Sequence, residues 1–206
     1  MKNKFEQQPM ALLVALLAVF SSTVNSQPSY YKVTSSLENY LNVRAEPSVD
    51  AADVGNLDPG AQPLEIIETD ESGNWGRIIW QETTAWVALR FLEPIELPQL
   101  ADTIVPIGLL CAGTEPFWTI EIESSQNAVL NTPEAATPMS ITNVSVSKNR
   151  SEDPVAIELF TKDYSAVTVV SRQACSDGLT DIKYNWAADV ILQPDLNLLS
   201  GCCVTR

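Results

Sequence analysis

The amino-acid sequence predicts an all-β protein with two successive β domains. From Tyr31 onward, short apolar runs alternate with turn residues about every 8 to 12 positions, the spacing of short antiparallel strands, and no long stretch has a helical period. Prolines at 94, 98 and 106 interrupt this pattern, and all four cysteines lie beyond the interruption. We therefore expect a small barrel, followed by a disulfide-stabilised antiparallel β-barrel or sandwich.

Residues 1–26 have the parts of a secretory signal peptide. Lys2 and Lys4 precede the apolar run Met10–Phe20, and small polar residues lead to a cleavage site after Ser26. The run is shorter than the roughly 20 residues that cross a bilayer, so we expect no membrane span after cleavage. The mature chain is expected in the periplasm or outside the cell.

The charge balance and the absence of histidine exclude several classes of function. With 12 basic and 26 acidic residues the net charge is −14, which disfavours binding to nucleic acid or to anionic membrane surfaces. Without histidine the usual general base, the usual zinc ligand and the Ser-His and Cys-His nucleophile pairs are missing. We expect a protein that is not an enzyme and holds no cofactor; no oligomeric state is predicted.

The first domain is expected over residues 30–95 and begins with a strand that breaks into a turn. In Leu41–Pro47 apolar and polar side chains alternate, as in a strand with one face on a core, and Pro47 ends the ladder. Residues 71–74 are expected to close a hairpin between Leu64–Glu68 and Trp75–Trp80. Residues 84–92 supply a closing strand and a final turn.

Four ordered segments resemble the bacterial SH3-like (SH3b) domain of exported proteins: Leu41–Pro47, Val54–Gly60, Trp75–Ile79 and Trp86–Leu92. The opening Leu-Asn-Val-Arg and the two tryptophan-led strands carry the resemblance. Ala85 departs from it, because glycine commonly stands before the closing tryptophan. The resemblance implies a barrel of five or six strands that docks an envelope protein onto cell-wall peptide or onto a protein partner.

Arg44, Trp75 and Trp86 are candidates for lining a peptide groove in this domain. An aromatic face and a forked cation suit short peptides with free carboxylates, and Glu46 adds a carboxylate in the opening turn. The alternative is structural: Trp86 belongs to the core, while Arg44 and Glu46 stabilise the turn.

A linker is expected over residues 96–104, because prolines flank a stretch without regular period. The second domain is then residues 105–206. Its apolar runs predict seven strands, at Phe117–Ile122, Ala128–Leu130, Met139–Val146, Val155–Phe160, Ala166–Arg172, Trp186–Ile191 and Leu196–Val204.

The four cysteines are expected to form two disulfides, as is usual in an exported chain. Cys202 and Cys203 are adjacent, and a bond between them would close a strained ring. Since neighbours on a strand point to opposite faces, each is expected to pair with one of Cys111 and Cys175. Which of Cys111 and Cys175 pairs with Cys202, and which with Cys203, remains open.

Three motifs of the second domain resemble an uncharacterised family of exported bacterial proteins: Cys111–Trp118, Cys175–Asp181 and Gly201–Cys203. The resemblance implies no activity. Within the first motif, Glu115 and Trp118 are candidate ligand contacts. Glu115 could also be a buried carboxylate with a raised pKa, suited to acid catalysis, or part of a tight entry into a strand.

Asp177 and Asp181 are weak candidates for binding a metal ion, because Ca²⁺ accepts carboxylates and backbone oxygens from a short loop. The spacing is not that of a helix-loop-helix calcium loop. The alternative is a turn in which the aspartate caps backbone N–H groups.

The sequence thus favours a non-enzymatic protein of the cell envelope that binds cell-wall peptide or an envelope protein. Two other hypotheses stay open. One is an inhibitor or sensor that binds a cationic protein such as lysozyme; the other is a cell-wall hydrolase whose catalytic part is the second domain.

Overall fold

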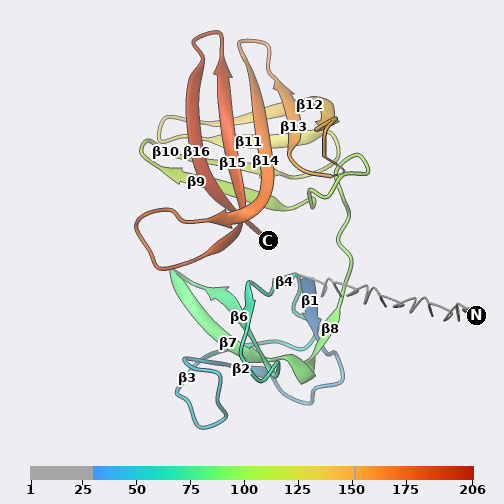
Figure 1. Ribbon diagram of the computed structural model, residues 1–206, viewed down its shortest axis with the longest axis vertical. Coiled ribbons are helices and arrows are strands. Elements are labelled where there is room, and N and C mark those ends of the chain that lie inside the picture. Colours follow the sequence, from blue (N-terminus) through green and yellow to red (C-terminus); the bar gives the residue numbers. More distant parts are fainter. Residues whose placement is uncertain (1–29, 151) are drawn as a thin grey trace, which may run out of the picture.

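The computed structural model describes residues 30–150 and 152–206, and the predicted signal peptide lies outside these ranges. The prediction of an all-β protein is confirmed: the described residues form sixteen strands and one short 3-10 helix, η1 (Leu89–Phe91). Figure 1 shows strands β1–β8 gathered at one end of the molecule and strands β9–β16 at the other.

Strands β1–β8 form the N-terminal module (residues 30–95). They are β1 (Tyr30–Val33), β2 (Leu41–Arg44), β3 (Asp53–Leu57), β4 (Leu64–Glu65), β5 (Glu68–Thr69), β6 (Trp75–Trp80), β7 (Thr83–Ala88) and β8 (Leu92–Pro94). They make two sheets, in the orders β4-β1-β8 and β3-β2-β7-β6-β5. The alternation predicted for β2 is confirmed, since Leu41 and Val43 are buried in the core while Asn42 and Arg44 are half-buried on the other face.

One predicted hairpin of this module is wrong in its first strand. Leu64–Glu68 is not a single strand: β4 pairs with β1 in one sheet, and β5 pairs with β6 in the other. The two sheets are therefore joined through Ile66 and Ile67, and Ile66 packs where a Cβ on Gly76 would lie. The expected turn does form, because the Asp70 carboxylate accepts backbone N–H groups of Ser72, Asn74 and Trp75.

Strands β9–β16 close into an eight-stranded antiparallel barrel (residues 105–206). They are β9 (Leu109–Thr114), β10 (Phe117–Ile122), β11 (Asn127–Asn131), β12 (Ala136–Val146), β13 (Val155–Phe160), β14 (Ser165–Cys175), β15 (Tyr184–Gln193) and β16 (Asn197–Thr205). Each strand pairs with the next, and β16 returns to β9. Side chains such as Ile120, Leu130, Ile157 and Trp186 fill the interior, as expected at this strand number.

The seven predicted strands of the second domain all occur, and the structure adds β9. Its sequence, Leu-Leu-Cys-Ala-Gly-Thr, is short of β-branched and aromatic residues, so its strand signal is weak. Pairing with both β10 and β16 makes it a strand.

The expected linker over residues 96–104 is not a free connection. Leu100 is 0% exposed and belongs to the barrel core, together with Val105. Thr103 donates a hydrogen bond from Oγ1 to the carbonyl of Leu100 and accepts the N–H of Val105. The segment lacks a regular period because a compact turn, rather than a strand, carries Leu100 into the core.

The two expected disulfides are present, and the structure decides between the two pairings: Cys111 pairs with Cys203, and Cys175 pairs with Cys202. Cys111 and Cys203 are cross-strand neighbours on β9 and β16 and lie in the barrel core. Cys202 faces the other side of β16, where it holds the end of β14. The opposite-face argument is therefore confirmed.

The two parts of the chain meet at a polar domain junction made of Tyr30, Glu65, Asn185, Trp186 and Thr205. The Tyr30 hydroxyl accepts hydrogen bonds from Trp186 Nε1 (3.2 Å) and Thr205 Oγ1 (3.1 Å). The Glu65 carboxylate accepts the Asn185 amide (3.2 Å) and the Thr205 N–H (3.3 Å). Burial raises the pKa of the Glu65 carboxyl, and these hydrogen bonds offset the rise only in part.

Candidate functional site

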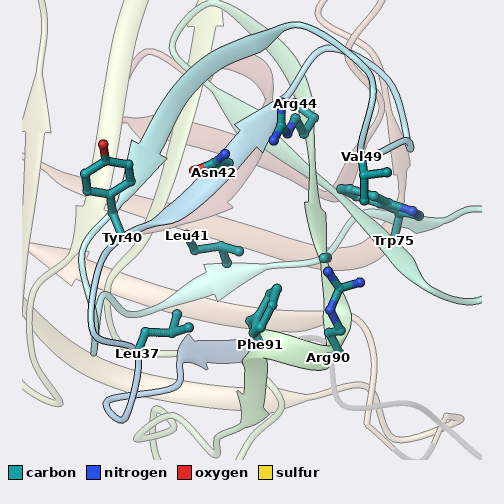
Figure 2. A pocket seen from close by; sticks show the side chains of 10 residues that line it. Leu37, Tyr40, Leu41, Asn42, Arg44, Val49, Trp75, Arg90 and Phe91 are labelled. Atoms are coloured by element: carbon teal, nitrogen blue, oxygen red, sulfur yellow. The ribbon is translucent and has the colours of Figure 1, made fainter.

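The outer face of β2 borders a groove of about 230 Å³ in the N-terminal module, shown in Figure 2. Asn42 and Arg44 reach this face because Leu41 and Val43 occupy the core face. Tyr40, just before β2, and Val49, in the loop that follows it, also line the groove. Figure 2 shows side chains from β2, β6 and the turn after β7 surrounding the same space.

The floor and one wall of the groove are apolar. Ala88 on β7 lies opposite Trp75 on β6, and its short side chain leaves space between the neighbouring strands. Trp75, Trp86 and Ala88 form a small buried cluster against which Phe91 of η1 packs. Trp75 and Phe91 therefore form an aromatic wall of the groove, and packing within this cluster fixes their positions.

Two arginines border the groove, and each is held in place by the module itself. Arg44 Nη1 donates to the carbonyl of Ala51 at 2.9 Å, which ties the guanidinium to the loop after β2. The Arg90 guanidinium lies 4.5 Å from the centre of the Phe91 ring. Neither arginine forms an ion pair with a carboxylate in the described residues.

The structure brings together some of the predicted site residues and separates others. Arg44 and Trp75 both line the groove. Trp86 lies beside it but is buried, with the Arg77 guanidinium 4.6 Å above its ring. Glu46 is exposed in the loop after β2 and does not line the groove.

Sequence reasoning named only Arg44 and Trp75 among the residues that line the groove, and it missed Tyr40, Val49, Arg90 and Phe91 among others. Arg90 and Phe91 lie in η1, where neither strand nor helix periodicity indicates which way a side chain points. Tyr40 and Val49 flank β2 and are exposed, at 55% and 60%. The sequence signal available for these two was a large apolar side chain close to each end of the predicted strand and turn, Leu41–Pro47.

The proposed buried acid in the second domain is wrong. Glu115 is exposed at the tip of the β9–β10 hairpin, as is Phe117, whereas Trp118 is 3% exposed in the barrel core. The glycines of the first and third motifs, Gly113 and Gly201, serve close packing. A Cβ on Gly113 would meet the Trp118 indole, and one on Gly201 would meet the carbonyl of Ala112. The first and third motifs thus describe how β9, β10 and β16 fit together.

Asp177 caps a turn. Its Oδ1 accepts the N–H groups of Leu179 (3.0 Å) and Thr180 (2.9 Å). Slight desolvation acts to raise the pKa of this carboxyl, but the hydrogen bonds outweigh it and the pKa lies below its ordinary value. Residues 30–150 and 152–206 contain no cluster of three or more acidic or cysteine side chains placed to hold a metal ion.

Comparison with known proteins places the groove inside a recognised module. Residues 39–93 match the bacterial SH3 domain family, whose members are typically cell-wall binding modules. The barrel has no family assignment, so the resemblance stated for its motifs gains no support. No curated protein and no solved structure matched the chain.

The family match and the two disulfides indicate an extracytoplasmic protein. Among the residues that the structure describes, no helix has the length and apolar character needed to cross a membrane.

Proposed function

We propose that this chain is a non-enzymatic protein of the bacterial cell envelope, periplasmic or secreted, whose N-terminal module binds cell-wall peptide in the groove beside β2. The observation that carries the proposal is the coincidence of two findings. The segment that matches a typical cell-wall binding family is also the segment that holds an open groove with an aromatic wall and two positioned cations.

The shape of the groove suits a short, flexible peptide better than a folded partner. Its volume of about 230 Å³ is below the roughly 300 to 1,000 Å³ of pockets for drug-sized ligands, so it holds only a few small residues. Trp75 and Phe91 offer apolar contact to such residues, and the Asn42 amide can both donate and accept hydrogen bonds. A β-sheet frame keeps these groups in place before the ligand arrives, which lowers the cost of binding.

Sedimentation with purified peptidoglycan tests the proposal on the full mature chain. We expect the protein to pellet with the insoluble wall and to be released by soluble wall peptides. A protein that stays in the supernatant at every wall concentration would contradict the proposal.

A matched pair of variants tests whether the groove is responsible. Val49→Asp places a carboxylate at the groove rim, at a side chain 60% exposed, so folding is expected to be intact while wall binding falls. Val54→Asp makes the same change on β3, at a side chain 43% exposed that does not line the groove, and is expected to bind like the native chain. Equal binding by both variants would place the wall site elsewhere.

A further inference from the structure

Acidic residues outnumber basic residues in the N-terminal module, yet two of the basic residues border the groove. Residues 30–95 hold eleven acidic and only four basic residues. Lys32 pairs with Glu93 at 3.0 Å, and Arg77 pairs with Glu68 at 2.8 Å. The remaining two, Arg44 and Arg90, have no acidic partner in the described part of the chain, and both border the groove.

The two arginines are placed to act at separate points. In Figure 2 Arg44 lies above and Arg90 below, with Trp75 beside the space between them. They belong to different elements, since Arg44 ends β2 and Arg90 lies in η1. The groove is therefore bordered by two positive charges within a module whose other charges are mostly negative.

We propose that the groove recognises a short peptide with two carboxylates, one bound by Arg44 and the other by Arg90, with the peptide's apolar part against Ala88 and Trp75. This inference rests on the proposed binding of cell-wall peptide and adds the charge class of the ligand.

The arginines have the donors that this recognition needs. A guanidinium carries five N–H donors, and the bond from Arg44 to the Ala51 carbonyl uses only one nitrogen. The other N–H groups remain for a carboxylate, whose two oxygens match the planar fork. Contact with the Phe91 ring restrains Arg90 in the same way, so little side-chain freedom is lost when the ligand binds.

The net charge of the protein distinguishes a small dianion from a long polyanion. At −14 the chain as a whole repels an extended chain of phosphates. At physiological salt, charges act over only about 8 Å, so a small peptide in the groove experiences mainly the two arginines. A short peptide with two carboxylates is thus favoured over anionic wall polymers.

Four synthetic peptides of one sequence test the inference without any change to the protein. The parent is a wall tetrapeptide with two free carboxylates, the α-carboxylate of a γ-linked glutamate and the C-terminus; the others are amidated at either position or at both. Calorimetric titration should show about tenfold weaker binding for each amidation, the effect of losing one charge-assisted hydrogen-bonded contact. Binding of all four with equal affinity would overturn the inference and leave the proposed function standing.

Two protein variants then assign each carboxylate to its arginine. Arg44→Gln should abolish the effect of one amidation and Arg90→Gln the effect of the other, while Lys32→Gln, which removes a charge away from the groove, should leave both effects unchanged. If only one of the two amidations weakened binding, the proposed contact of both carboxylates with arginines would be overturned. Failure of every peptide to bind, together with no sedimentation on peptidoglycan, would overturn the proposed function itself.

Discussion

The groove and the domain junction both hold charged side chains, yet they differ in how far those side chains are open to solvent. In the groove, Arg44 and Arg90 are partly open to solvent. At the junction, Glu65 is 7% exposed, and its hydrogen-bond partners are the neutral Asn185 amide and the Thr205 N–H.

The difference follows from the cost of removing charge from water. A partly solvated guanidinium keeps its charge at little cost and stays available to a ligand. A buried carboxylate is destabilised in its charged form, so the pKa of Glu65 rises. The groove is therefore suited to binding, whereas the junction links the two parts of the chain. Changes at the junction should alter stability, and changes in the groove should alter binding.

Glu65→Lys should have the largest effect on stability. It would place a cation against the Asn185 amide and the Thr205 N–H, leaving one half-buried and one buried donor without an acceptor. We expect a loss of about 3 kcal/mol or more in the free energy of unfolding, measured by urea denaturation. Glu82→Lys, the same charge change at an exposed turn between β6 and β7, is the control. Equal loss in both variants would show that net charge, rather than the junction, is responsible.

Tyr30→Phe should have an intermediate effect. The variant keeps the ring but removes the acceptor of Trp186 Nε1 and Thr205 Oγ1. We expect the unfolding free energy to fall by about 1 to 3 kcal/mol, because buried donors are left unsatisfied. Tyr40→Phe removes a hydroxyl from a side chain 55% exposed in the groove and should leave the unfolding free energy nearly unchanged.

The pH dependence of stability should show the buried carboxylate directly. In the unfolded chain Glu65 ionises near its ordinary pKa of 4.5, whereas the folded chain keeps the proton to higher pH. The folded state therefore binds more protons between these two pKa values, and stability falls as the pH rises through this interval. Above the folded pKa the loss is constant.

Glu65→Gln isolates this contribution, because its amide does not ionise. The unfolding free energy of the native chain should fall relative to that of the variant as the pH rises from about 4 toward 8. Burial, followed by the nearby Glu65 charge, raises the pKa of Tyr30 above its ordinary value of 10.0, so Tyr30 stays neutral throughout this range. A difference that does not vary with pH would mean that Glu65 ionises alike in both states.

Arg90→Gln should have the smallest effect on stability. The Arg90 side chain is exposed and has no ion pair in the described residues, so the unfolding free energy should change by no more than about 0.5 kcal/mol. A large loss of stability would make this arginine a structural residue and remove the contrast with Glu65. Unfolding followed by tryptophan fluorescence provides the measurement.

Local patterns in the sequence were sufficient for most of the strands. The alternation of Leu41 and Val43 with polar residues predicts β2, and Val155–Phe160 occurs with the predicted bounds. The same face rule separates Cys202 from Cys203. Arg44 and Trp75 could be predicted as groove residues because each belongs to a recognisable segment of the SH3-like pattern.

The remaining features depend on residues that are distant in the chain. Cys203 pairs with Cys111 because closure of the barrel brings β16 beside β9. Leu100 is buried because its turn packs against the barrel core, although the sequence of that turn has no strand or helix period. Arg90 joins the groove because η1 turns it toward β2.

The junction makes the same point most clearly. Tyr30 and Glu65 meet Trp186 and Thr205 only because the barrel docks on β1 and β4. A strand period records which face of one element is buried, and this information is local. Which charged groups find partners, and which are left for a ligand, depends on how whole elements pack, and for Arg44, Arg90 and Glu65 only the tertiary structure shows it.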